Sequence, residues 1–179
     1  MSGRDERGRR IRLRILLLLG LPLFPLPARG GPVGRLVPSP SGGSDVQWAL
    51  AKASALAELK LKDSSCREIF SEFRDSQGRP LAENLEAAGS DAIGYLRGRL
   101  LFYSGYGRPA CATLDTIAFT SPGSAVVFLC WQQFVEKTHR DPGLAAALLI
   151  HEELHSLGLG ENPPSSKEIT ARVIARCGK

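Results

Sequence analysis

The sequence is poor in several residues that often carry chemistry, since its 179 positions include only three histidines, two tryptophans and one methionine. It contains no glycine-rich phosphate loop, no serine nucleophile elbow and no catalytic cysteine–histidine signature. These absences exclude the nucleotide-binding proteins and covalent hydrolases that depend on such motifs. None of the four cysteines belongs to a Cys-x-x-Cys pair, which excludes a zinc ribbon. The length suits one ordinary domain.

The body of the chain also lacks net charge. The formal net charge of the whole sequence is +5, from 23 basic and 18 acidic side chains. Residues 1–29 hold seven of the basic residues and two of the acidic ones, so 16 of each remain in the rest of the chain. A basic surface is therefore not expected on the folded domain, and we do not expect a nucleic acid as a partner.

Residues 1–29 have the three-part pattern of an export signal. Arginines come first, an apolar stretch at 15–24 follows, and small residues end the segment. This stretch is short and interrupted by Pro22, whereas a membrane-spanning helix needs about 20 apolar residues. We therefore expect residues 1–29 to be removed, 30–44 to form a flexible lead-in and 45–179 to form the domain. The expected location is secreted or periplasmic, with no stable membrane span after signal removal.

All four cysteines lie after this leader, and an oxidising compartment would let them pair. Four cysteines allow three connectivities. We expect two disulfides and favour Cys111 with Cys130, because two neighbouring strands would carry them. This choice leaves Cys66 with Cys177.

Apolar residues at helical spacing predict helices at both ends of the domain. The first follows Ser44 and Asp45, which can cap it, and the second is a short helix with Ser65 and Glu68 as a capping box. Further helices are expected at 81–88, at 142–157 and from 167 to about 175. Of these, the helix at 142–157 has the strongest start, an aspartate followed by a proline, and ends at a glycine.

The middle of the chain is rich in β-branched and aromatic residues, which predicts strands at 99–103, 114–119 and 125–130. A turn at 121–124 makes the last two an antiparallel hairpin. Trp48 and Trp131 are expected in the core. The fold class is therefore α+β, a single domain in which N-terminal helices and a small, mainly antiparallel sheet pack on the helix at 142–157.

That helix carries the sequence His-Glu-Glu-Leu-His. His151 and His155 are four residues apart, so both imidazoles project from one face and can bind a single zinc ion. Glu152 is displaced by about 100° around the helix axis. In that position it can reach a water on the ion and act as the general base. Glu153 has no such role and is expected to face solvent or to support a ligand.

A catalytic zinc needs a third protein ligand and one position left for water. Glu161 is favoured as that ligand, because Gly158 between it and His155 lets the helix end and the chain fold back. Glu168, on the last predicted helix, is the alternative, since a ligand from a second helix is equally good chemistry.

A helix with His-Glu-x-x-His, preceded by a strand hairpin, resembles the zincin metallopeptidases. The spacing from His155 through Gly158 to Glu161 resembles the extended metzincin motif with glutamate as its last ligand. Met1 is the only methionine, so the methionine turn of the metzincins is absent.

This resemblance implies a zincin-like fold with one zinc ion, held by His151, His155 and Glu161, and with Glu152 as general base. In zincins a strand beside the active-site helix also binds extended substrate, a role that would belong to residues 125–129.

The function expected from the motif is that of a secreted, monomeric, zinc-dependent metallohydrolase, most simply a peptidase acting on a peptide or protein substrate. The alternative is an exported, non-catalytic zinc-containing binding or interaction module, whose zinc would be closed by four protein ligands. His139, Tyr103 and Tyr106 are weaker candidates that could stabilise a developing oxyanion.

Overall fold

The computed structural model describes residues 35–36 and 43–178. The expected export signal and most of the expected lead-in lie outside these residues. Within the expected lead-in, the backbone of Arg35–Leu36 pairs with a strand of the domain as β1. Within the described ranges, no helix combines the length and the apolar character needed to cross a membrane.

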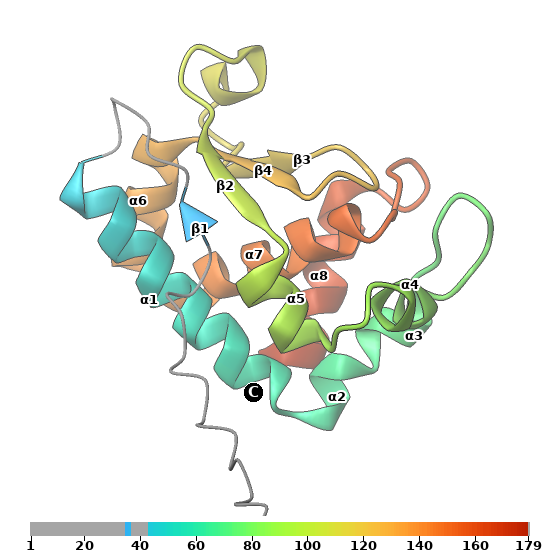
Figure 1. The fold of residues 1–179 in the computed structure, drawn as a ribbon. Coiled ribbons are helices and arrows are strands. Elements are labelled where there is room, and N and C mark those ends of the chain that lie inside the picture. Colours follow the sequence, from blue (N-terminus) through green and yellow to red (C-terminus); the bar gives the residue numbers. More distant parts are fainter. Residues whose placement is uncertain (1–34, 37–42, 179) are drawn as a thin grey trace, which may run out of the picture.

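The described chain is a mixed α+β domain (Figure 1). Its strands are β1 (Arg35–Leu36), β2 (Leu101–Ser104), β3 (Ala118–Thr120) and β4 (Val126–Leu129), and η1 (Pro109–Ala112) is a 3-10 helix. Its α-helices are α1 (Ser44–Leu61), α2 (Ser64–Arg67), α3 (Ile69–Glu72), α4 (Leu81–Ala87), α5 (Ala92–Gly98), α6 (Trp131–Arg140), α7 (Pro142–Ser156) and α8 (Ser166–Cys177).

The sheet has the order β1-β2-β4-β3. The hairpin of β3 and β4 is antiparallel, as predicted, and Gly123 provides the positive φ of 78° in its turn. The prediction of a mainly antiparallel sheet is wrong, because β2 pairs in parallel with both β1 and β4. The reason is the long connection between β2 and β3, which allows β4 to return to β2 in the same direction.

Helix α7 lies in the middle of the molecule, between α1 and α8 and beneath the sheet (Figure 1). Its first half presents small residues at 145–147, and α1 faces it with the fully buried Ala49, Ala53 and Ala57. Small side chains let the two helix backbones approach closely, so α7 is buried along almost its whole length. The candidate site therefore lies on a helix that is enclosed by the core of the domain.

Several local predictions need correction. Helix α6 was not predicted, although its buried Phe134 and Thr138 have helical spacing. Trp48 is 47% exposed and stacks on His139 of α6 at 4.6 Å between ring centroids, so Trp48 is not a core residue. The cap of the short helix that was expected to start at Ser65 is also different, because Asp63 and not Ser65 caps α2.

Two disulfides join Cys66 to Cys177 and Cys111 to Cys130, the two pairs that the sequence analysis favoured. The reason given for the second pair was wrong, since Cys111 lies in η1 and not in a strand. The first disulfide connects α2 with the end of α8. Both disulfides are typical of proteins from oxidising compartments.

Candidate metal centre

Helix α7 begins after Asp141 and ends before Gly158, as the sequence predicts. The side chain of Asp141 accepts a hydrogen bond from the backbone N–H of Leu144 (2.9 Å), and Pro142 occupies the first turn. At the other end, Gly158 has a φ of 108°, a conformation that favours glycine. The helix therefore stops directly after His155, and the chain turns back toward it.

Three potential ligand atoms converge at this end of the helix. The Nε2 atoms of His151 and His155 are 2.9 Å apart, and Glu161 Oε1 is 3.2 Å from His155 Nε2. One ligand atom from each residue lies within 4.8 Å of the others, and within the described part of the chain this is the one such group of three that could hold a metal. Both histidines are 3% exposed, whereas the Glu161 side chain is 41% exposed. The group is therefore buried on two sides and open at Glu161.

The outer nitrogens of the two imidazoles have partners that orient the rings. His155 Nδ1 donates to the carbonyl oxygen of Leu159 (2.7 Å), because a carbonyl can only accept. In the neutral ring this bond leaves Nε2, the nitrogen nearest to His151 and Glu161, as the atom that can bind a metal ion. His151 Nδ1 bonds to the hydroxyl of Thr170 on α8 (3.0 Å). Such partners fix the ring orientation and the tautomer of metal-binding histidines.

Burial keeps His151 neutral. It lowers the pKa of His151 to about 3, and the neighbouring His155 lowers it further in the same direction. A neutral imidazole is the form that binds a metal ion, since the ligand nitrogen must be free of its proton.

Glu152 is a buried carboxyl beside this group. The residue is 4% exposed, and its Oε2 atom is buried without a hydrogen-bond partner among the described residues. Burial raises its pKa to about 8, the nearby Thr120 hydroxyl lowers it by less, and the charge of Glu161 raises it again. A buried carboxyl with a raised pKa next to three convergent ligand atoms is typical of functional sites.

Glu153 is not exposed to solvent, which corrects one of the two roles expected for it. The residue is fully buried, and neither of its carboxyl oxygens has a hydrogen-bond partner in the described structure. Burial raises its pKa well above the ordinary value, and the charge of Asp91 adds to this effect. Asp91 caps α5, so Glu153 lies on the α5 side of α7, away from the convergent ligands.

The two candidates for a third ligand have different surroundings. Glu161 lies beside His155, whereas the carboxylate of Glu168 accepts from the backbone N–H of Ser165 (2.8 Å) and from its hydroxyl (2.7 Å). These bonds form a capping box for α8 and lower the pKa of Glu168. The structure therefore brings Glu161, and not Glu168, to the histidine pair.

A groove of about 540 Å³ opens beside His151 and Glu152. Its walls come from α7, α8 and the segment 115–118, and include the apolar side chains of Leu148 and Ile174. Ile174 is 44% exposed, although it is a large aliphatic residue. The groove therefore presents an apolar surface next to the convergent ligands.

Strand β3, whose first residue Ala118 lines this groove, is the last strand of the sheet in the described chain. Cys130 N donates to Ile117 O (2.9 Å), and Ala118 is paired opposite Leu129. Because bonding alternates along an antiparallel pair, the N–H and C=O of Ala118 and Thr120 point away from β4. These groups are therefore placed to pair with an added strand.

The strand expected to bind substrate, at 125–129, is mostly β4, which lies between β2 and β3. Both of its edges are already hydrogen-bonded, so this expectation is wrong and β3 has the available edge. The turn of the hairpin is also attached to α7, since Gly123 N donates to His155 O (2.9 Å). This bond places β3 beside the candidate metal centre.

The weaker candidates lie elsewhere. His139 is on α6, in contact with Trp48, and Tyr106 is 74% exposed in a separate depression beside η1. Thr120 and Thr170 also lie at the site, beside Glu152 and His151, and nothing in the sequence around them distinguishes them from other threonines.

Comparison with known protein families, with curated proteins and with solved structures finds no match to this chain.

Proposed function

We propose that this protein is a zinc-dependent metallohydrolase of the zincin type, and that it cleaves peptide bonds. The observation that supports the proposal is the convergence of His151, His155 and Glu161 beside the buried carboxyl of Glu152. Two imidazoles and a carboxylate are a common ligand set for catalytic zinc, and a three-ligand site keeps a position for water.

Bound zinc would lower the pKa of a water molecule and polarise the substrate carbonyl. Glu152 would accept a proton from that water and deliver it to the leaving amine. A cation close to Glu152 favours its carboxylate form, which opposes the effect of burial on its pKa. Once Glu152 has taken up the proton, burial of its carboxyl favours this protonated form, which would then donate the proton to the leaving amine.

The substrate in this proposal is an extended peptide that pairs with the free edge of β3. Ala118 and Thr120 offer their backbone N–H and C=O groups at that edge, and main-chain pairing of this kind tolerates many sequences. The adjacent groove would accept an apolar side chain against Leu148 and Ile174. The proposal includes a secreted or periplasmic location, which the two disulfides support.

The test is a comparison of Glu152→Gln with wild-type protein purified with both disulfides formed. We expect one zinc ion per chain in both proteins and a loss of peptide hydrolysis of about 10²- to 10⁴-fold in the variant, the usual contribution of a general base. Glu136→Gln is the matched control, since Glu136 is an exposed glutamate paired with Arg140 on α6.

A wild-type protein that binds no zinc would contradict the proposal. Zinc bound by the wild type without any peptide hydrolysis would instead identify the non-catalytic zinc module. The half-exposed Glu161 argues against that outcome, because a structural zinc is normally enclosed by four protein ligands.

A further inference from the structure

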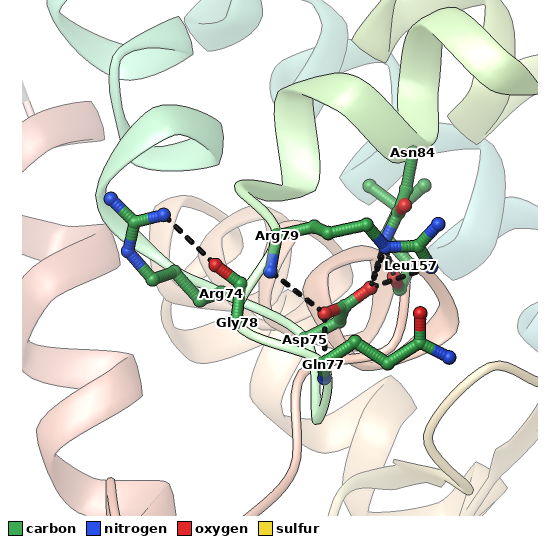
Figure 2. Close-up of polar contacts among 7 residues, drawn as sticks. All are labelled: Arg74, Asp75, Gln77, Gly78, Arg79, Asn84 and Leu157. Atoms are coloured by element: carbon green, nitrogen blue, oxygen red, sulfur yellow. Dashed lines mark hydrogen bonds and ion pairs between the residues drawn. The ribbon is translucent and has the colours of Figure 1, made fainter.

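The C-terminal end of α7 is held by a polar cluster that comes from a distant part of the chain (Figure 2). The carbonyl oxygen of Leu157, at the end of the helix, accepts a hydrogen bond from Asn84 Nδ2 on α4 (2.8 Å). The same amide nitrogen donates to Asp75 Oδ2 (3.0 Å). A side-chain amide has two N–H groups, so both are used in this cluster.

Asp75 accepts most of the hydrogen bonds in the cluster. Its Oδ1 accepts from the backbone N–H groups of Gln77 (2.9 Å) and Arg79 (3.0 Å), and its Oδ2 accepts from Arg79 Nε (2.9 Å). Figure 2 shows these bonds around the carboxylate, with Asn84 between Asp75 and Leu157. The bonds from Asn84 and Arg79 hold the pKa of Asp75 well below its ordinary value. The carboxylate therefore remains an acceptor that orients the Asn84 amide.

The turn after α7 is packed directly on this cluster. A Cβ atom at Gly158 would lie 3.1 Å from the Cβ of Asp75, and Gly158 has a φ of 108°. Glycine is therefore required here both for its backbone conformation and for the close approach of Asp75.

The opposite side of the same turn faces the candidate metal centre. The carbonyl of Leu159 accepts the Nδ1 proton of His155 (2.7 Å), and Leu159 N donates to Leu154 O (3.0 Å). Glu161 follows two residues later. The segment 157–159 thus contacts Asn84 on one side and sets the tautomer of His155 on the other.

We propose that Asp75 and Asn84 are positioning residues for the metal centre. They hold the turn at 157–159 so that His155 and Glu161 converge, although neither residue touches a ligand atom. This inference rests on the proposed function, because it assigns the cluster a role in metal binding.

The first test measures zinc affinity, by competition with a chelator, for Asn84→Leu, which removes both amide bonds at similar volume. We expect zinc to bind about 10- to 100-fold more weakly, the usual effect of losing a group that orients a metal ligand. Ser65→Ala is the matched control, since it removes a side-chain bond to the Arg176 carbonyl at the end of α8 (3.1 Å). The control should keep zinc affinity within about twofold, as expected for a site that it does not touch.

Asp75→Asn is a milder second variant that keeps the shape of the side chain and removes its charge. We expect it to fold and to bind zinc a few-fold more weakly. Wild-type zinc affinity in both variants, or equal losses in the Ser65→Ala control, would overturn the inference.

A second measurement separates this inference from the proposed function. In zinc-free protein, we expect Asn84→Leu to increase the hydrogen exchange of the Leu159 amide and to broaden or remove the His155 Nδ1 proton signal. The amide of Ala145, at the other end of α7, should be unchanged. A wild-type protein that binds no zinc would contradict the proposed function alone. Unchanged signals of Leu159 and His155 in Asn84→Leu would overturn the positioning role.

Discussion

The two sides of α7 contain similar residues in very different surroundings. Toward α8 and β3, His151 and His155 have oriented rings, and Glu152 borders a groove. Toward α5, Ser156 is hydrogen-bonded to the hydroxyl of Tyr95 (3.0 Å), while Glu153 is fully buried without a hydrogen-bond partner in the described structure. The adjacent glutamates are thus both buried with raised pKa values, yet only one of them adjoins convergent ligands.

This difference shows that burial of a carboxyl does not by itself identify a site. Leaving a buried polar group without a partner costs about 1–3 kcal/mol, so both glutamates destabilise the fold. At Glu152 the cost falls on a carboxyl that lies next to three convergent ligand atoms and borders a groove. Around Glu153 the described part of the chain contains no such group of ligand atoms.

The largest effect that would test the side facing α8 is the loss of a metal ligand. We expect Glu161→Ala to weaken zinc binding by more than the roughly 100-fold that loss of a supporting partner can cause. Glu168→Ala should leave zinc affinity unchanged and slightly reduce the free energy of unfolding, because it breaks the capping box of α8. Zinc titration and urea unfolding measure the two effects. The opposite order of zinc affinities would make Glu168 the ligand.

The next effect concerns the side facing α5. Glu153→Met replaces a buried carboxyl by an apolar side chain of similar volume, so we expect an increase of about 1–3 kcal/mol in the unfolding free energy of zinc-free protein near pH 7. The pKa of Glu153 is raised in the folded state, so its unfavourable contribution grows as the pH rises above its unfolded value of about 4.3. The stability difference between the variant and the wild type should therefore be small at pH 4 and larger at pH 8.

Ser156→Ala is the control on the same side of α7. It removes the bond to Tyr95, and we expect a loss of about 1 kcal/mol with little dependence on pH. If Glu153→Met were less stable than wild type at neutral pH, the buried carboxyl of Glu153 would stabilise the fold and the expectation would be wrong.

The smallest expected effect is on the pH dependence of stability, and it comes from the Asp75 cluster at the C-terminal end of α7. The pKa of Asp75 is lowered in the folded state, mainly by Asn84 and Arg79. Its stabilising contribution is therefore present above the unfolded pKa of about 3.9 and is lost as the pH falls below it. Asp75→Asn should flatten the acid side of the stability curve, measured by urea unfolding between about pH 5 and 2. Asp115→Asn, in an exposed loop segment, should retain the wild-type slope.

Local chemistry explains which elements could be predicted from the sequence. The cap at Asp141, the proline after it and the glycine at 158 define α7 almost to the residue. The turn around Gly123 defines the hairpin of β3 and β4. In contrast, only Cys130 separates the end of β4 from the start of α6 at Trp131, so no turn residue marks where this helix begins.

The histidine pair was visible in the sequence for the same local reason, because four residues make one turn of a helix. The surroundings of the site were not visible. Thr170 and Asn84 come from α8 and α4, and only packing brings them to His151 and to the end of α7. The direction of β4 relative to β2 also depends on a long connection whose path no local pattern specifies.

The sequence by itself determined the helix, the spacing of His151 and His155, and the turn that ends the helix, since each depends on contacts between residues a few positions apart. The tertiary structure decided that Glu161 and not Glu168 lies beside the histidines, and that Glu152 borders the groove. It also decided that β3 is the edge strand of the sheet in the described chain. These features depend on contacts between segments that are distant in the chain, and their geometry arises only when α7 is packed between α1, α8 and the sheet.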